Sequence, residues 1–484
     1  MRDSIVVFIN GQRHEVRGPA ALLTLSDYLR RQCGLVGTKI VCSEGDCGAC
    51  TVLVGRPTAD GQSLDYQPID SCIRFMFQLD GTHVVSVEGI AEPGSLNAVQ
   101  QAMVDCHGSQ CGFCTPGFVM TMTGMLQNGG VGDEAAWKHG LTGNLCRCTG
   151  YTQILEAGAE AARQSSLTLN ERYPAAELLA AISALAGDDV AIAGELADGE
   201  HAVTAPATLA AALEFLGEHP DATVAAGATD IGVRVNKTGV LPYRLLDVNR
   251  IAELDFVSVD DGVLHCGARA SWAAIEEATT EIAPEFHRIL NRFGGPQIRA
   301  AGTIAGNIAN GSPIADSLPF LFVMQAEVET TSAAGTRTIP IDQFYLGYKQ
   351  LALEPGELIT GVQIPLPTAA DQLRLYKISR RRDLDISTFT AGIRLRVDAG
   401  EITLARVALG GVGPTVVRAS AAEAVLVGAP LEEATFRAAG DAAAREVAPI
   451  SDVRGAAEYR RQLVRNIFVK YFLETAASAT AGAL

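Results

Sequence analysis

The sequence lacks long apolar runs and any excess of positive charge. No segment reaches the ~18 uninterrupted apolar residues of a membrane span, and the apolar run within the first ten residues is too short for the core of a signal peptide. The formal net charge of the 484 residues is -17, which would repel nucleic acid and anionic membrane surfaces. With 48% hydrophobic and 19% charged residues, we expect a globular, cytoplasmic protein of several domains with neither of these partners.

Histidine is scarce, and cysteine is almost absent after residue 149. The eight histidines form no His-x-x-x-His pair, so the sequence gives no support to catalysis by a single bound metal ion. Ten of the eleven cysteines precede residue 149, and only Cys266 follows it. In a cytoplasmic chain, thiols gathered in this way favour metal binding over disulfides. The sequence therefore indicates metal sites in the first part of the chain.

The first cysteine group combines a closely spaced run with one distant partner. Cys42, Cys47 and Cys50 follow the pattern C-x4-C-x2-C, and Cys72 supplies a fourth thiol. This spacing is typical of a plant-type 2Fe-2S site. Gly45 and Gly48 suit the loop of such a site, because glycine tolerates positive φ and lets the backbone approach the sulfides. The alternatives are unrelated buried thiols and structural zinc, which prefers two close pairs. The group therefore predicts a 2Fe-2S cluster.

The second cysteine group consists of two close pairs, Cys111 with Cys114 and Cys146 with Cys148. Thr115-Pro116 has the character of a cap and a first-turn proline, so one pair is expected at the start of a helix, where unpaired amides favour an anionic cluster. Two close pairs also suit zinc, which stays open as an alternative on spacing alone, although C-x-C is less usual for zinc.

Local patterns predict the elements around these groups. Asn10-Gly11 predicts a β-hairpin formed by residues 5–9 and 13–16, and Thr24 or Ser26 is expected to cap a helix that ends at Gly34. Thr51–Val54 reads as a strand. A further helix begins near Ser95, with its buried face predicted from the helical spacing of Leu96, Val99, Met103 and Val104.

A connecting segment is expected at residues 166–200, with one helix over 175–185. Just before it, Gly130-Val-Gly132 carries the letters of a dinucleotide fingerprint, but it follows a helix rather than a strand and is expected to be a loop. Cys33 and Cys106 fit no ligand spacing and are expected to be packed thiols.

The second half alternates helix and strand and contains two loops rich in small residues. A helix is expected over 209–216, a strand over 223–226, and then the run Ala225–Gly232. Gly302–Ser312 forms the second loop. Such loops expose amides to anions, and together with Asp316 they suit a pyrophosphate and a ribityl chain. Near the C-terminus we expect a half-buried strand at 392–397, a strand at 405–409 and a helix over 456–473.

These motifs together resemble those of the molybdenum hydroxylases. CSEGDCGAC (42–50), CGFCTPG (111–117) and GNLCRCTGY (143–151) look like the iron-sulfur region of that family. VAAGATDIG (224–232), AGTIAGNIANGSPIAD (301–316) and SRRRDLDIS (379–387) resemble its flavin region. The resemblance covers nearly the whole chain. The iron-sulfur part precedes the flavin part, as in xanthine dehydrogenases. In this respect the chain resembles the small subunit of the bacterial enzymes, which contains the iron-sulfur and flavin domains.

The resemblance implies an α+β multidomain fold. It assigns residues 1–90 to a β-grasp 2Fe-2S ferredoxin domain, 91–165 to a four-helix-bundle 2Fe-2S domain, 166–200 to the linker, 201–370 to a vanillyl-alcohol-oxidase-type FAD domain and 371–484 to a C-terminal α/β flavoprotein subdomain. It makes all eight cysteines of the two groups ligands of 2Fe-2S clusters.

The resemblance also assigns flavin contacts. The pyrophosphate would lie against Ala225, Ala226, Gly227, Ala228, Thr229, Asp230 and Ile231; the phosphate and ribityl part against Thr303, Ile304, Ala305, Gly306, Asn307 and Asp316; the adenine side near Ile359; and the isoalloxazine end near Lys377. Phe293 would face the nicotinamide of NAD, and Gln110 the molybdopterin. No catalytic residue is expected in this chain.

The function implied is electron transfer in a xanthine dehydrogenase. Electrons from hypoxanthine or xanthine hydroxylation at the molybdenum cofactor of a partner subunit would pass through two 2Fe-2S clusters to FAD and then to NAD. The expected assembly is a heterotetramer of two small and two large subunits. The alternatives are the same path in an enzyme for another heterocycle or an aldehyde, and an electron-carrier module without a reaction of its own.

Overall fold

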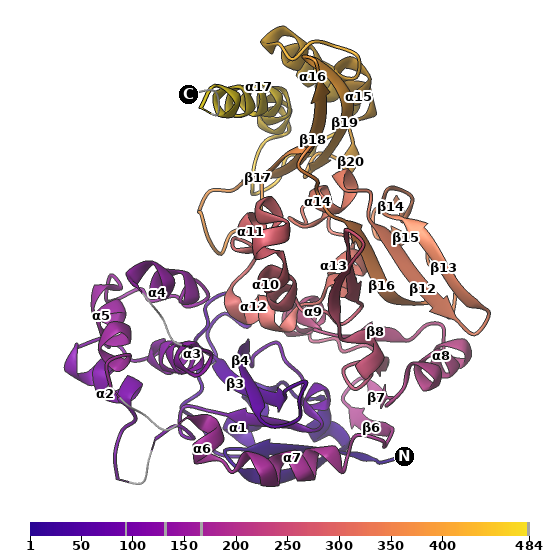
Figure 1. Ribbon diagram of the computed structural model, residues 1–484. Coiled ribbons are helices and arrows are strands. Elements are labelled where there is room, and N and C mark those ends of the chain that lie inside the picture. Colours follow the sequence, from indigo (N-terminus) through magenta and orange to yellow (C-terminus); the bar gives the residue numbers. More distant parts are fainter. Residues whose placement is uncertain (92–93, 130–132, 165–167, 482–484) are drawn as a thin grey trace. The chain divides into compact units, whose positions relative to one another are not determined.

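The computed structural model describes residues 1–91, 94–129, 133–164 and 168–481, with side chains as far as Thr475 (Figure 1). The loop expected at Gly130–Gly132 and the domain border expected at 165/166 lie outside these residues. The chain divides into two compact units. The first comprises Met1–Glu253 and Gly294–Thr303, and the second Leu254–Phe293 and Ile304–Leu484.

The first unit opens with a mixed five-stranded sheet in the order β2-β1-β5-β3-β4, in which β1 runs antiparallel to β2 and parallel to β5. Asn10 and Gly11 have positive φ, which confirms the predicted hairpin turn, and the Thr24 side chain accepts a hydrogen bond from the Asp27 amide, as expected for the helix cap. The elements are β1 (Ser4–Ile9), β2 (Gln12–Arg17), η1 (Gly18–Leu22), α1 (Leu25–Arg31), β3 (Thr51–Pro57), β4 (Leu64–Asp70), η2 (Met76–Leu79) and β5 (Thr82–Val85).

Both faces of β1 are buried, because this strand lies between two hydrophobic cores. Ile5, Val7 and Ile9 pack into one core with α1, whereas Val6 and Phe8 pack into a second core with the helices that follow the sheet. A strand covered on both sides reads as a continuous apolar run rather than an alternating one. This explains the sequence SIVVFI.

The second core is filled from a group of helices beside β3 and β4 (Figure 1). Val99 and Met103 are buried as predicted, but Leu96 and Val104 are exposed. Asn97 caps α2, so Leu96 precedes the helix, and Val104 is turned about 100° from Met103, away from the core. The helices are α2 (Ala98–Asp105), α3 (Thr115–Gln127), α4 (Glu134–Gly140), α5 (Thr152–Ala161), α6 (Leu169–Arg172) and α7 (Ala175–Ser183).

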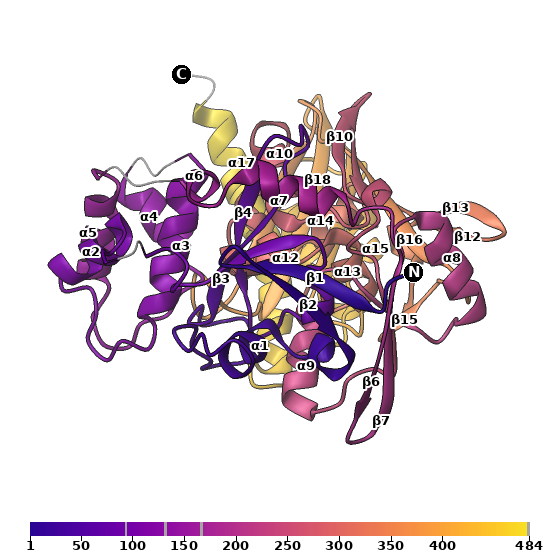
Figure 2. The same cartoon turned by 90° about the horizontal axis from the view of Figure 1, so that it is seen from below.

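A four-stranded sheet in the order β6-β7-β9-β8 completes the first unit, and Figure 2 shows β6 and β7 as a hairpin. Strand β6 occupies part of the segment expected to be a connection with one helix. Val190, Val203 and Leu245 of this sheet join the core that also contains Ile5, so the two sheets share apolar packing. The elements are β6 (Val190–Leu196), β7 (Gly199–Ala205), α8 (Leu209–Glu218), β8 (Thr223–Ala225), α9 (Thr229–Thr238), β9 (Arg244–Asp247) and, from later in the chain, α12 (Pro296–Ala301).

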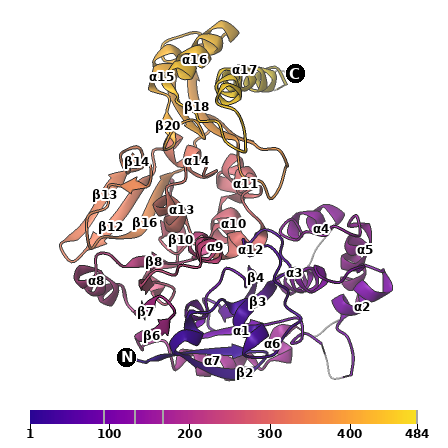
Figure 3. The same ribbon diagram turned by 180° about the vertical axis from the view of Figure 1, so that it is seen from behind.

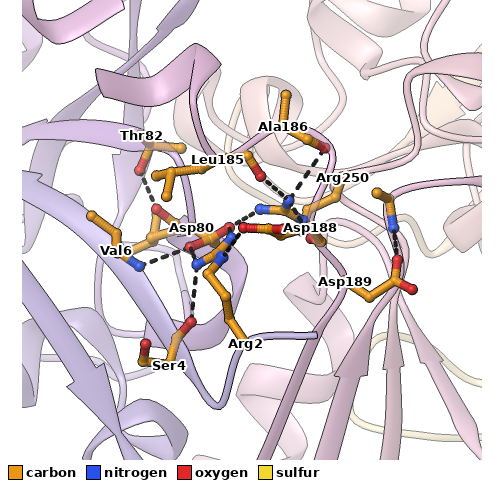
Figure 4. Close-up of polar contacts among 12 residues, drawn as sticks. Arg2, Ser4, Val6, Asp80, Thr82, Leu185, Ala186, Asp188, Asp189 and Arg250 are labelled. Carbon is orange, nitrogen blue, oxygen red and sulfur yellow. Dashed lines mark hydrogen bonds and ion pairs between the residues drawn. The ribbon is translucent and has the colours of Figure 1, made fainter. Parts of the chain in front are cut away.

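A buried ion cluster also joins the parts of this unit (Figure 4). The Asp80 carboxylate is 1% exposed, pairs with both Arg2 and Arg250, and accepts a hydrogen bond from the Val6 amide at 2.7 Å. Arg250 in turn donates to the carbonyls of Leu185 (2.6 Å) and Asp188 (2.7 Å). Burial, and then repulsion from Arg2, lowers the pKa of Arg250 to about 10. Asp80 therefore ties the first sheet to the segment after β9, and Arg250 extends this connection to the segment after α7.

The first part of the second unit contains an antiparallel five-stranded sheet in the order β10-β11-β16-β12-β13, a small hairpin of β14 and β15, and the helices α10, α11, α13 and α14. Trp272, Phe286 and Phe320 are among its aromatic contacts, with the ring centroids of Phe286 and Phe320 stacked 4.0 Å apart. The elements are β10 (Val257–Asp260), β11 (Val263–Gly267), α10 (Trp272–Ile282), α11 (Pro284–Leu290), α13 (Ile304–Asn310), α14 (Leu318–Val323), β12 (Glu327–Ser332), β13 (Gly335–Pro340), η4 (Ile341–Gln343), β14 (Tyr345–Gly347), β15 (Gln350–Leu351) and β16 (Leu358–Pro365).

The unit ends in an antiparallel sheet, β17-β18-β19-β20, packed with three helices (Figure 3). Strand β18 was expected to be half-buried, but residues 389–395 are all buried. Arg394 is tolerated there because its guanidinium donates to the buried carboxylate of Asp371 at 2.8 Å. The elements are β17 (Gln372–Ile378), β18 (Phe389–Asp398), β19 (Glu401–Gly410), β20 (Val417–Arg418), α15 (Ser420–Leu426), α16 (Glu433–Glu446) and α17 (Ala457–Ala481).

Candidate iron-sulfur and flavin sites

The four thiols of the first group come together in the first unit. Cys42 contacts both Cys47 and Cys72, and Cys50 contacts Cys72. The hydrogen bond from Cys47 is the main reason that the pKa of Cys42 is lowered, and the same bond raises the pKa of Cys47. Amides of the loop also donate to the Cys42 sulfur, including that of Glu44 at 3.4 Å. Such donors stabilise a thiolate, the form that binds iron.

The loop depends on its glycines. Gly45 and Gly48 have positive φ, and a Cβ atom at Gly45 would lie 2.7 Å from Ile73 Cδ1 and 2.8 Å from Ile298 Cδ1. From α9, Asn236 donates to the carbonyls of Ser43 (2.9 Å) and Cys72 (2.8 Å). Helix α9 therefore helps to fix the thiol loop.

The second group forms two contacting pairs, Cys114 with Cys146 and Cys111 with Cys148. Cys146 is buried and accepts a hydrogen bond from the Thr149 hydroxyl at 3.2 Å, whereas Cys111 and Cys148 are exposed. Cys114 is itself the cap of α3. Thr115, expected to be the cap, is the first residue of the helix, and its hydroxyl donates to Ser109 at 2.9 Å.

The remaining thiols are packed among apolar side chains. Cys33 lies against the core containing Ile5, and Cys106 against the core containing Val6. Burial raises the pKa of Cys266 to about 12. Among the residues that the structure describes, no three or more His, Cys, Asp or Glu side chains surround one point as ligands of a single ion. A 2Fe-2S cluster requires a different arrangement, two thiolates on each iron, and the contacting thiols offer that.

The two thiol groups adjoin one another. The Leu145 amide, next to Cys146, donates to the Cys47 carbonyl at 3.0 Å, and the Asn144 side chain donates to the Gly48 carbonyl at 3.2 Å. A Cβ atom at Gly117, on the first turns of α3, would lie 2.0 Å from the Gly48 carbonyl oxygen. The segments that carry both groups are therefore in direct backbone contact.

The first flavin loop connects β8 to α9. Ala228 precedes the helix in the left-handed region, with φ 55°, so this turn presents successive peptide units at a helix N-terminus. Side chains from other segments donate hydrogen bonds to the carbonyls of the loop. Gln78 (2.7 Å) and Asn249 (2.8 Å) donate to Ala226, and Arg74 donates to Gly227 at 3.3 Å. Gln78 and Arg74 of the ferredoxin part, together with Asn249 after β9, therefore orient the loop, a support that the sequence did not reveal.

Gly227 is closely approached by the backbone of a later segment of the same unit. The structure shows that a Cβ atom would lie 2.1 Å from the Ala301 carbonyl oxygen in α12. Of the other predicted flavin residues in this unit, Ala225 and Thr303 are buried, and Ala226, Thr229 and Ile231 are half-buried. Asp230 is exposed.

In the second unit, Asp316 is the meeting point of the predicted flavin segments. Its carboxylate accepts hydrogen bonds from Lys377 Nζ and Ser387 Oγ, each at 2.5 Å, and the Lys377 and Asp316 side chains are 2% and 8% exposed. Asn307 accepts a hydrogen bond from Ser317 at 2.6 Å. The remaining predicted members on α13 are Ile304 and Ala305, which are buried, and Gly306, which is exposed.

The three remaining candidates, Phe293, Ile359 and Gln110, lie on different segments of the chain. Phe293 is half-buried, with its ring 5.1 Å from that of Trp272. Ile359 is buried on β16. Gln110 is exposed, immediately before Cys111. No sequence signal distinguished Arg74, Gln78, Asn144 or Gln297, which support the sites through buried hydrogen bonds.

Four family models match the chain in succession. They are a 2Fe-2S iron-sulfur cluster binding domain (residues 7–72), a [2Fe-2S] binding domain (86–159), the FAD binding domain in molybdopterin dehydrogenase (198–367) and the CO dehydrogenase flavoprotein C-terminal domain (374–475). Their order matches that expected from the motifs.

Curated relatives agree with these matches. Xanthine dehydrogenase 1 of Arabidopsis thaliana is 29% identical over 97% of this chain, and aldehyde oxidase 4 of Cavia porcellus is 28% identical over 97%. The chain spans 39% of the length of each.

Solved structures are similar as well. Reconstituted CO dehydrogenase from Oligotropha carboxidovorans is 30% identical, with a TM-score of 0.52 over 55% of this chain and 94% of that one. Quinoline 2-oxidoreductase from Pseudomonas putida 86 is 27% identical, with a TM-score of 0.53 over 57% and 96%.

The fold and the paired thiols define an iron-sulfur flavoprotein. The chain belongs to the molybdenum hydroxylase family, of which it contains the 2Fe-2S and FAD-binding part. Its residues fit these groups: two sets of four thiols in contacting pairs, and a tight turn before the N-terminus of α9. It therefore carries two 2Fe-2S clusters and FAD and acts as an electron-transfer module.

None of the helices in the part of the chain that the structure describes is long and apolar enough to cross a membrane.

Proposed function

We propose that this chain conducts electrons from the molybdenum cofactor of a partner subunit to NAD during the hydroxylation of hypoxanthine and xanthine. The observation that carries the proposal is the direct contact between the two thiol segments, through the Leu145 amide and the Cys47 carbonyl. Xanthine dehydrogenases from a plant, insects and a fungus are among the relatives aligned over 97% of the chain, which supports purine as the substrate class.

Each residue set has a proposed role. Cys42, Cys47, Cys50 and Cys72 hold the first cluster, and Cys111, Cys114, Cys146 and Cys148 hold the second. When bound, each cluster carries one electron and the flavin two, so the flavin supplies the point where electrons are paired for NAD. The loop 225–231 orients the pyrophosphate through its amides, and Lys377 with Asp316 forms a charge-paired surface at the isoalloxazine end.

Phe293 is proposed to face the nicotinamide. Its contact with Trp272 limits the movement of the ring, so it can present a fixed apolar surface to a planar ligand. The partner is proposed to be a separate molybdenum-containing polypeptide, in an assembly of two small and two large subunits.

A second candidate keeps the electron path and changes the substrate. Aldehyde oxidase 4 and quinoline 2-oxidoreductase are also similar to this chain, which favours an aldehyde or another heterocycle as the alternative. Copurification with the partner, followed by assays of NAD reduction with hypoxanthine, xanthine and an aldehyde, distinguishes them. We expect turnover with the purines, and turnover with the aldehyde alone would support the alternative. Turnover with none of them would favour a non-catalytic carrier.

A further inference from the structure

The short helix α12 connects three functional segments of the first unit, although it comes from much later in the chain. It lies in Gly294–Thr303, the only piece of that unit beyond residue 253. Its residues reach the first thiol loop, the second thiol segment and the first flavin loop, each through a different side chain or carbonyl.

Gln297 makes the central contacts. Its side chain is buried, with 1% of the residue exposed, and its two N–H donors are shared among Thr51 Oγ1 (3.1 Å), Thr121 Oγ1 (3.3 Å) and Asn144 Oδ1 (3.1 Å). Asn144 Oδ1 can only accept a hydrogen bond, and both hydroxyls donate to other groups, so these neighbours favour the amide nitrogen at this position. The three partners come from β3, α3 and the loop before Cys146.

Each partner of Gln297 adjoins a thiol segment. Thr51 follows Cys50, and its hydroxyl donates to the Gly48 carbonyl at 2.6 Å. Thr121 lies on α3, the helix capped by Cys114, and donates to Asn144 Oδ1 at 2.9 Å. Asn144 in turn donates to the Gly48 carbonyl at 3.2 Å. The Gln297 amide therefore belongs to one hydrogen-bonded network that connects the segments containing the two thiol groups.

Two other residues of α12 extend this connection. Ile298 packs against Cys50, Cys72 and Ile73, beside the first thiol group. The Ala301 carbonyl lies where a side chain at Gly227 would be, so it also fixes the approach of the first flavin loop. A displacement of α12 would thus reach all three segments.

We infer that Gln297 is a positioning residue that sets the placement of the two clusters relative to one another and the polarity around them. One-electron transfer between two centres falls steeply with their separation, and hydrogen bonds near cluster sulfurs tune their potentials. A single buried amide that is hydrogen-bonded to both thiol segments would affect the cluster separation and the cluster potentials together. This inference rests on the proposed cluster ligands but not on the proposed substrate or acceptor.

The test compares three variants of the full chain with its clusters and flavin bound. Gln297→Leu removes the donors and leaves three buried oxygens without this partner, and Gln297→Glu keeps the shape but replaces the donors by acceptors. Gln372→Leu, at a half-buried glutamine of the second unit, is the matched control. Dithionite reduces each protein, and electron paramagnetic resonance reports the signals, the potentials and the magnetic interaction of both clusters.

We expect both Gln297 variants to shift the potentials of both clusters and to change the magnetic interaction between them, whereas Gln372→Leu matches the unaltered protein. Loss of iron from both sites in Gln297→Leu, but not in the control, would also support the inference. Unchanged potentials and interaction in both variants would overturn it, even with a lower unfolding temperature, because the amide would then be merely structural. Loss or change at only one cluster would likewise contradict a joint role.

Discussion

At the scale of single residues, the two thiol groups can be tested independently of one another. Cys47→Ser removes a thiolate from the first group and Cys148→Ser one from the second, and serine is a poor ligand for iron. Each substitution is expected to abolish one of two distinct 2Fe-2S signals in electron paramagnetic resonance and to leave the other. Cys266→Ser, at a buried thiol of the second unit, is the control and should leave both. Two intact signals in Cys47→Ser and Cys148→Ser would refute the ligand assignment.

Asp316 is expected to control flavin content. Asp316→Ala leaves the Lys377 ammonium buried without its carboxylate and frees Ser387, so the segment proposed to hold the flavin loses its anchor. The flavin absorbance per chain should fall several-fold while the iron content stays unchanged. Asp441→Ala, at an exposed carboxylate of α16, should alter neither. Equal flavin in Asp316→Ala and the unaltered protein would exclude Asp316 from the site.

His83 makes the stability of the first unit depend on pH. Burial lowers its pKa to about 4, and its Nε2 atom accepts a hydrogen bond from the Gly11 amide, so the ring is neutral when folded. The unfolded chain takes up this proton near pH 6.5, the folded chain only near 4. Stability is therefore complete above about 6.5 and falls as the pH drops towards 4, by roughly 3 kcal/mol.

Denaturant unfolding at pH 7 and pH 4.5 measures this effect, with His83→Gln as the comparison. The unaltered protein should lose more stability between the two pH values than the variant does. An identical loss in both would show that His83 is not responsible.

At the scale of elements, the ion cluster around Asp80 should contribute more to the free energy of unfolding than an ion pair on the surface does. Asp80→Asn removes a buried carboxylate and leaves the partly buried Arg2 and Arg250 beside a neutral side chain, which typically costs about 3–5 kcal/mol. Asp3→Asn breaks an exposed pair with Arg17 and should change the stability by less than about 1 kcal/mol. Denaturant unfolding compares the two. Equal effects would mean that Asp80 does not join the elements as the contacts indicate.

Local signals predicted the elements near the thiols well. The Asn10-Gly11 turn, the Thr24 cap and the small-residue turn after β8 each have a cause within a few residues, so sequence alone reveals them. Burial was less predictable, because it depends on neighbours distant in sequence. Val104 has a helical spacing that suits the core, and Arg394 sits in a buried strand only because Asp371 faces it.

Sequence reasoning also could not identify α12 as part of the first unit. The contacts of Gln297 span 246, 176 and 153 residues, and no periodicity or spacing encodes a pairing over such distances. The paired thiols were predictable because a cluster demands a fixed set of ligands at short spacing. The residues that hold those loops in place are chosen by packing, and only the fold reveals them.

At the scale of the whole molecule, the proposal assigns the chemistry of the substrate to another polypeptide and the exit of electrons to this one. The chain covers 39% of the length of its xanthine dehydrogenase and aldehyde oxidase relatives, and its matches are to iron-sulfur and flavin domains. Its own residues are proposed to hold the carriers, to keep their separations and to orient the acceptor. The second cluster, with Cys111 and Cys148 exposed, is proposed to receive electrons from the partner.

The most direct test is to follow the visible absorbance of the purified chain under anaerobic conditions after adding NADH or xanthine, with and without the molybdenum subunit. We expect NADH alone to bleach the flavin and both clusters of the isolated chain, and xanthine to do so only when the partner is present. Bleaching by xanthine without the partner, or none by NADH, would contradict the proposed electron path.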